Sequence, residues 1–195
     1  MRKIIVFNLV SLDGYFSRIN GDLDWHNVDD EFNQFAVRET QKFGKILFGR
    51  ITYKIFEDFW PKALTDPKMS EADHKIAKII DDIEKIVFSK TLKNVSWKNT
   101  KLFHEIDSRE IKKLKQTRGR DMVIFGSGTI VQALTNFGLI DEYWLLVNPI
   151  VLGRGKQLFP HMKDILKIKL LKTKTFKNGN VLLCYSPRFG NRSSR

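Results

Sequence analysis

A glycine turn joins a buried strand to a helix near the middle of the chain. The apolar run 122–125 leads into Gly126, Ser127, Gly128 and Thr129, after which apolar residues recur at helical spacing. Such a turn places several backbone N–H groups at a helix N-terminus, where the donors and the helix dipole both favour a phosphate or diphosphate. The alternative is a tight strand-to-helix connection that binds nothing. This stretch alone leaves both interpretations open.

Three further clusters of polar or glycine residues follow apolar runs. They are Ser11–Gly14, Gly49–Thr52 and Ser89–Thr91. Strands that alternate with helices favour a parallel sheet, and ligands of such sheets bind beyond the carboxyl ends of the strands. We therefore expect all four clusters to lie on one rim of the sheet.

Hydrophobic periodicity predicts an α/β fold with a doubly wound, mostly parallel sheet. The expected order is strand, helix, strand, two helices, two strands, helix, strand, helix and strand, followed by an antiparallel C-terminal hairpin. The hairpin strands cover about 166–176 and 181–186, with Asn178 and Gly179 at the turn. The alternation of side chains slips at 170–171, which indicates a β-bulge.

The helix boundaries follow from capping residues and proline. One helix begins near Asp29 and carries apolar residues at helical spacing as far as Phe43, with acidic residues in its first turn. Another begins at the capping box formed by Ser70 and Asp73. The helix that opens after the second strand is expected to stop before 60–61, because the residue before a proline avoids helical geometry.

The composition is that of one ordinary domain. The 195 residues are 42% hydrophobic and include fifteen Phe and four Trp, which is enough for one substantial core. We expect a single domain over 1–188 and a flexible tail over 189–195. No apolar run approaches the roughly 20 residues of a membrane span. Cys184 is the single cysteine and lies in an apolar strand, which favours a buried thiol in a reducing cytoplasm.

The net charge of +12 does not indicate nucleic-acid binding. The lysines are spread along the chain at solvent-facing spacings, and no compact basic block with interleaved aromatic residues is present. The four histidines lie in separate segments without metal-ligand spacing, so no metal is expected. His26 is next to Trp25 and could face a ligand site, but a solvent-facing loop residue is the expected interpretation.

The clusters, in this order, resemble the dihydrofolate reductase fold family. The closest resemblance is to the C-terminal reductase domain of the bifunctional riboflavin-biosynthesis deaminase–reductase, RibD. The motifs that carry it lie at 11–14, 47–53, 88–91, 125–129 and 139–153, and read SLDG, LFGRITY, FSKT, FGSGT and a run from LIDEYW to PIVLG. The resemblance covers essentially the whole chain and implies NADPH as the hydride donor.

The resemblance also implies which residues bind the cofactor. They are Gly14, Gly49, Arg50, Thr52, Ser89, Lys90, Gly126, Ser127, Gly128 and Thr129. Arg50 would pair with a cofactor phosphate through its guanidinium fork, whereas its alternative is a solvated arginine at a helix start. Ser89 and Lys90 match the site of the ribose 2′-phosphate, which favours NADPH over NADH. Their alternative is an ordinary polar strand end.

Ser127 departs from the family pattern. Relatives often carry adjacent glycines at this turn, joined by a cis peptide. A cis bond before a residue other than proline costs roughly 2.5–4 kcal/mol. The sequence leaves the conformation of the bond between Gly126 and Ser127 open.

The resemblance gives a second set of residues on the substrate side. They are Leu12, Asp13, Trp25 and Phe35. A carboxylate in an apolar pocket could hold the amino-imine edge of a pyrimidine or pterin and promote ring protonation. Counting forward from Trp25 selects Asp30 as this acid, and counting back from Phe35 selects Glu31. Asp13 is a third catalytic candidate, although an Asp-Gly turn explains it equally well.

The sequence therefore predicts an NADPH-dependent reductase that transfers a hydride to a pyrimidine- or pterin-like small molecule. The best-known reaction of this branch reduces 5-amino-6-(5-phosphoribosylamino)uracil in riboflavin biosynthesis. Two features weaken that assignment: no deaminase domain precedes this one, and Phe56, Phe59 and Trp60 form an aromatic-rich region typical of single-domain relatives. Dihydrofolate reduction and nucleotide binding without turnover are the alternatives. Members of the branch commonly form homodimers, for which 139–152 and the hairpin could supply an interface.

Overall fold

The computed structural model describes residues 1–160, 162 and 164–188. The strands of its main sheet are β1 (Ile4–Ser11), β3 (Phe43–Gly49), β4 (Glu84–Phe88), β5 (Thr100–Phe103), β6 (Asp121–Ile124), β7 (Glu142–Asn148), β9 (Ile168–Thr175) and β10 (Val181–Pro187). Their order across the sheet is β5-β4-β3-β6-β1-β7-β10-β9. The first six run parallel, and β10 pairs antiparallel with β7 and β9. The expected fold class is confirmed. The expected tail, 189–195, lies outside the described residues.

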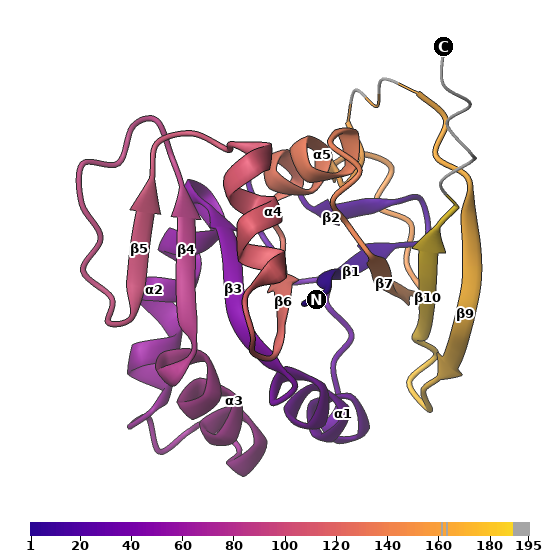
Figure 1. Ribbon diagram of the computed structural model, residues 1–195. Coiled ribbons are helices and arrows are strands. Elements are labelled where there is room, and N and C mark those ends of the chain that lie inside the picture. The colour runs from indigo at the N-terminus through magenta and orange to yellow at the C-terminus, as the bar shows by residue number, and fades with distance from the viewer. Residues whose placement is uncertain (161, 163, 189–195) are drawn as a thin grey trace.

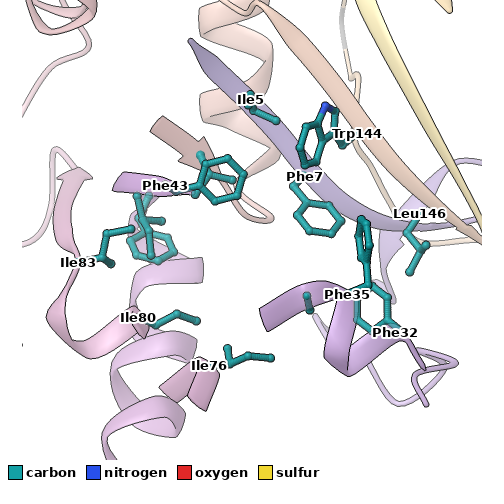
Figure 2. Packing of buried hydrophobic residues seen from close by; sticks show 14 of the residues in the cluster. Ile5, Phe7, Phe32, Phe35, Phe43, Ile76, Ile80, Ile83, Trp144 and Leu146 are labelled. Atoms are coloured by element: carbon teal, nitrogen blue, oxygen red, sulfur yellow. The ribbon is translucent and has the colours of Figure 1, made fainter. Parts of the chain in front are cut away.

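Helices cover both faces of this sheet (Figure 1). They are α1 (Asp30–Thr40), α2 (Arg50–Ala63), α3 (Glu71–Asp82), α4 (Ser108–Gln116) and α5 (Gly128–Asn136). α1, α2 and α3 pack on one face, and α4 and α5 on the other, each with its own apolar cluster. Figure 2 shows the first cluster, in which the ring of Phe7 lies between those of Trp144 and Phe35. The sheet is therefore doubly wound, as expected.

Two expected helix boundaries are wrong. α1 ends at Thr40, and Phe43 instead opens β3, where its side chain is buried in the core. α2 continues through Trp60 and Pro61 to Ala63. The Trp60 ring packs against two aromatic rings one turn or less earlier in α2, and Ala63 is buried, so packing outweighs the backbone hydrogen bond that proline cannot make.

The local signals in the C-terminal hairpin and in α3 are confirmed. Cys184 pairs with Lys172 while Tyr185 pairs with Leu170, which leaves Leu171 as the extra residue of a β-bulge. At the start of α3 the Ser70 side chain accepts from the Asp73 backbone, and the Asp73 side chain accepts from the Ser70 backbone. Both features are local, and therefore readable from neighbouring residues.

A buried ion pair lies at the end of the sheet opposite the strand exits, where β1 and β7 begin. The Lys115 ammonium, at the end of α4, donates to Leu139 O at 3.0 Å and to Asp141 Oδ2 at 2.5 Å. The same Asp141 oxygen accepts from Ile4 N at 2.7 Å. The carboxylate of Asp141, the residue that precedes β7, thus joins the end of α4 to the start of β1.

The described residues include no helix with the length and apolar character needed to cross a membrane. Cys184 is fully buried, and burial raises the pKa of its thiol to about 11. The cytoplasmic location stays a prediction.

Candidate functional site

The exits of four parallel strands form one rim of the sheet. β4, β3, β6 and β1 are consecutive neighbours, so the clusters that follow them lie side by side, as the sequence predicted. Asn8 of β1 fixes the start of the glycine turn: its Nδ2 donates to Gly126 O at 3.1 Å, and its Oδ1 accepts from Gly126 N. Sequence reasoning missed Asn8, although an amide within an otherwise apolar strand is a usable signal.

The turn at 126–129 is bound directly to the start of α2. Ser127 N donates to Thr52 Oγ1 at 3.0 Å, and Ser127 Oγ accepts from Gly49 N at 2.9 Å. Gly126 and Ser127 both have φ of +54°, in the left-handed region. A Cβ atom at Gly126 would lie 3.0 Å from Thr52 Oγ1, so glycine is required for this close approach. The described chain contains no cis peptide bond, which answers the open question at Ser127.

The two helices that begin at this rim differ from the other three. α1, α3 and α4 are capped by the side chains of Asp29, Ser70 and Asp107, and each carries acidic residues in its first turn. Within the described part of the chain, α2 and α5 have neither a side-chain cap nor an acidic first turn. Their N-termini are adjacent because Ser127 contacts both. Adjacent helix N-termini without acceptors of their own form a site for an anion with more than one negative group.

The remaining cofactor candidates lie around these two N-termini. Arg50 is the first residue of α2 and is exposed, and within the described chain it makes no ion pair. Thr129 is exposed in the first turn of α5. On the opposite side of the rim, Gly14 has φ of +85° and donates its N–H to Ser11 O at 2.9 Å, which closes the turn after β1.

The exit of β4 carries a turn closed by Ser89. Its Oγ accepts from Thr91 N at 3.2 Å and from Leu92 N at 3.0 Å, while Lys90 is exposed. His104, at the exit of the neighbouring β5, has its Nδ1 3.0 Å from Ser89 O. His104 lies at the rim because β5 pairs with β4, and the spacing of residues in the sequence does not reveal that pairing.

The two acids at the start of α1 have different surroundings. Glu31 accepts from Lys174 Nζ at 2.7 Å and from Lys177 N at 3.1 Å, and these bonds hold the pKa of its carboxyl below the usual value. It therefore ties α1 to the hairpin of β9 and β10. Asp30 is exposed, and among the described residues nothing binds its carboxylate. Across all the described residues, no group of three His, Cys, Asp or Glu side chains is placed to hold a metal ion.

Asp13 is engaged by three donors. Its carboxylate accepts from Ser11 Oγ at 2.6 Å, from Leu152 N at 3.1 Å and from Gly153 N at 2.8 Å. The Ser11 hydroxyl and these two backbone N–H groups lower the pKa of the Asp13 carboxyl. The neighbouring Leu12 is 68% exposed at the rim, free to contact a ligand.

Trp25 and His26 form an edge-to-face pair beside the exit of β7. Their ring centroids are 4.5 Å apart, and Asn27 N, next in sequence, donates to Asn148 Oδ1 at 2.9 Å. Trp25 is 7% exposed, and among the described residues its buried Nε1 has no acceptor. His26 is half-buried rather than solvent-facing, because its ring packs against Trp25, and no described residue forms a hydrogen bond with its buried Nε2. The expectation for His26 was wrong.

Replacing His26 with phenylalanine is expected to make the protein less sensitive to acid. Burial lowers the pKa of His26 from 6.5 to about 4, so between these values the unfolded chain binds more protons and the free energy of unfolding decreases as the pH is lowered. From pH 7 to pH 5 the wild type should lose about 1–2 kcal/mol more than the variant, after allowance for partial exposure. Urea denaturation at both pH values measures this. Equal losses in the two proteins would contradict it.

Aromatic rings form the surface next to the glycine turn on the side of α1 and α2. Phe35, a predicted substrate residue, is buried in the core with its ring 6.3 Å from that of Phe7. Phe125 precedes the glycine turn, and its ring stacks on Phe56 of α2 at 5.9 Å. Both rings are partly exposed, as is the neighbouring Trp60. The accessible aromatic surface therefore belongs to β6 and α2 rather than to Phe35.

The model of the RibD C-terminal domain family matches residues 2–182. The chain belongs to this family. The Bacillus subtilis (strain 168) protein YyaP, whose function is uncharacterised, is 32% identical over 187 residues, which are 94% of both chains. The site just described is therefore the strand-exit rim of a RibD C-terminal domain.

Solved structures share the same fold. A putative riboflavin biosynthesis protein from Shewanella sp. PV-4 superposes with a TM-score of 0.71 at 23% identity, over 96% of this chain and 99% of that one. A Thermotoga maritima diaminohydroxyphosphoribosylaminopyrimidine deaminase/5-amino-6-(5-phosphoribosylamino)uracil reductase gives 0.64 at 14%, over 96% and 57%. Enterococcus faecalis dihydrofolate reductase gives 0.63 at 12%, over 96% and 97%. The fold of this RibD C-terminal domain is thus that of dihydrofolate reductase.

Proposed function

We propose that the protein is an NADPH-dependent reductase that transfers a hydride to a pyrimidine- or pterin-like small molecule, most like 5-amino-6-(5-phosphoribosylamino)uracil. One observation carries the proposal: the uncapped N-termini of α2 and α5 meet at Ser127 on the strand-exit rim. The name of the Thermotoga relative supports the reaction type.

The residues of the rim fit a dinucleotide with phosphate groups. The backbone N–H groups at 50–52 and 128–129 would hold the diphosphate, and the Arg50 guanidinium would pair with it. Lys90 would contact the ribose 2′-phosphate. Ser89 Oγ accepts two backbone N–H groups and lies 3.4 Å from Thr91 Oγ1, so a phosphate here would meet the hydroxyl pair of Ser89 and Thr91. When bound, NADPH would supply the hydride.

The substrate would lie against the aromatic surface of β6 and α2. The partly exposed rings of Phe56, Trp60 and Phe125 offer flat faces for a heterocycle and exclude water from it. Orienting this ring against the nicotinamide is the main contribution expected of such an enzyme. Of the two acids at the start of α1, Asp30 is the one whose carboxylate no described residue binds, and we assign it the role of binding the ring edge and supporting protonation.

Two measurements test the proposal. NADPH is titrated at low salt while the fluorescence of the four tryptophans is followed, and NADPH oxidation is then measured with a panel of aminopyrimidines, pterins and dihydrofolate. We expect saturable binding and turnover with an aminopyrimidine or pterin. Turnover with dihydrofolate alone would indicate a dihydrofolate reductase, and binding without turnover would indicate a nucleotide-binding protein. Absence of NADPH binding would exclude every function that depends on this cofactor. A parallel titration with duplex DNA tests whether the positive net charge serves nucleic-acid binding.

We further propose that the protein forms a homodimer through the apolar hollow beside β7. This hollow of about 490 Å³ is lined by Tyr143, Leu145, Phe159 and Ile168, among others. Ile168→Lys is expected to give a monomer in light scattering, because it places a charge within the hollow. Leu23→Lys, at an exposed apolar residue outside the hollow, is the control and should stay dimeric. A monomeric wild type would refute the proposal.

A further inference from the structure

A small ribbon covers the start of α5. β2 (Tyr15–Ser17) and β8 (Lys156–Gln157) pair antiparallel, apart from the main sheet. Sequence reasoning placed neither strand. Figure 1 shows β2 beside α5. A Cβ atom at Gly128 would lie 3.1 Å from Phe16 Cε1 and 3.4 Å from Gln157 O, so both strands of the ribbon contact the first residue of α5. The ribbon therefore forms a wall beside one of the two uncapped helix N-termini.

The two loops that carry the ribbon meet at Asp13. This residue lies between β1 and β2, and its carboxylate accepts the N–H groups of Leu152 and Gly153, which lie between β7 and β8. Beside it, Leu12 N donates to Ile150 O at 2.8 Å. Ser11 Oγ, which also donates to Asp13, accepts from Tyr15 N at 3.0 Å. All of these bonds join the two loops or fix the turn that leads into β2.

The ribbon itself depends on close approach at Gly155. A Cβ atom there would lie 2.4 Å from Ser17 O and 3.0 Å from Tyr15 Cβ, so any larger residue would push β8 away from β2. Asp13 and Gly155 thus act on the same ribbon from two places. Neither is in the glycine turn or in α2, so each can be altered without changing the anion site itself.

We propose that Asp13 is a positioning residue whose carboxylate holds the ribbon of β2 and β8 against the start of α5, and so retains a bound dinucleotide. The identity of the ligand rests on the proposed function. The hydrogen bonds by which Asp13 joins the two loops do not depend on it. This role of Asp13 differs from direct proton transfer. A carboxylate that accepts three hydrogen bonds at once is suited to fixing loops.

The test compares Asp13→Ala, Asp13→Asn and Gly155→Ala with the wild type. Asp66→Ala is the matched control, because Asp66 is another loop aspartate that accepts a backbone N–H, that of Lys68 at 2.9 Å. Hydrogen exchange of the Leu152 and Gly153 amides is measured without cofactor, and NADPH affinity and release are measured by fluorescence. Steady-state kinetics then separate effects on kcat from effects on KM.

Asp13→Ala is expected to speed exchange of both amides at least about tenfold and to raise the NADPH Kd about tenfold, chiefly through faster release. Gly155→Ala should reproduce the loss of affinity. Asp13→Asn, which still accepts a hydrogen bond but carries no acidic proton, should fall between the wild type and Asp13→Ala. The Asp66→Ala control should match the wild type in every measurement.

Three results would overturn the inference. The first is unchanged exchange of the two amides in Asp13→Ala. The second is a large fall in kcat with unchanged NADPH binding in both Asp13 variants, which would make Asp13 a catalytic acid. The third is normal NADPH binding in Gly155→Ala. Failure of the wild type to bind NADPH would instead refute the proposed function. The amide exchange would still decide whether the Asp13 carboxylate holds the two loops together.

Discussion

Replacing Ser127 with aspartate is expected to weaken NADPH binding at least about 100-fold and to lower the melting temperature, because Ser127 is 6% exposed and a carboxylate is costly to bury. A carboxylate at this position would lie at the uncapped start of α5 and beside that of α2. It could accept the Gly49 N–H as Ser127 Oγ does, and it would repel a diphosphate by about 4 kcal/mol per pair of charges 4 Å apart near the surface. Aspartate also tolerates the left-handed φ of +54° found here.

Ser70→Asp is the matched control for this experiment. It likewise places a carboxylate at a helix N-cap, but at α3, whose start is already closed by a capping box. NADPH affinity should not change in this variant. Fluorescence titration and thermal melts of the two variants measure both quantities. Undiminished NADPH binding by Ser127→Asp would show that the diphosphate does not lie at these N-termini.

Removing the carboxylate of Asp141 is expected to destabilise the protein by about 3 kcal/mol. Asp141→Ala leaves the Lys115 ammonium, which is 6% exposed, without its counter-charge and leaves Ile4 N without an acceptor. An uncompensated buried charge costs about 3–5 kcal/mol, and we take the lower end because the Asp141 side chain is 30% exposed. Urea denaturation measures the change in the free energy of unfolding.

The double variant Lys115→Met/Asp141→Ala separates the two sources of this loss. Without the ammonium, no unpaired charge remains, so the double variant should be more stable than Asp141→Ala by about 1–2 kcal/mol. A double variant less stable than Asp141→Ala would mean that Lys115 matters mainly through its hydrogen bond to Leu139 O.

Features set by short stretches of sequence were predictable. The order of strands and helices of the main sheet, the capping box at Ser70 and the bulge beside Leu170 each follow from residues close in the chain. The shared rim was also predictable, since parallel neighbouring strands must end at the same edge. The rim is the part of the candidate site that the sequence could define, because its residues follow directly from strand ends.

Features set by distant partners were not predictable. Counting along the chain could not distinguish Asp30 from Glu31, because Glu31 is engaged by Lys174, which is 143 residues away. The role of Asp13 depends on backbone N–H groups about 140 residues later in the chain. The ribbon of β2 and β8 consists of strands of three and two residues, too short to show periodicity.

The sheet ends in β5 on one side and β9 on the other, and among the described strands nothing pairs with the outer row of backbone groups of either one. Such rows readily recruit strands from other molecules, and lysine is a common deterrent. β9 carries Lys169, Lys172 and Lys174, and β5 carries Lys101. Part of the net charge of +12 thus lies on the two edge strands, where another strand could otherwise pair. Resistance to aggregation at high concentration, rather than attraction of nucleic acid, is a sufficient reason for this part of the basic surface.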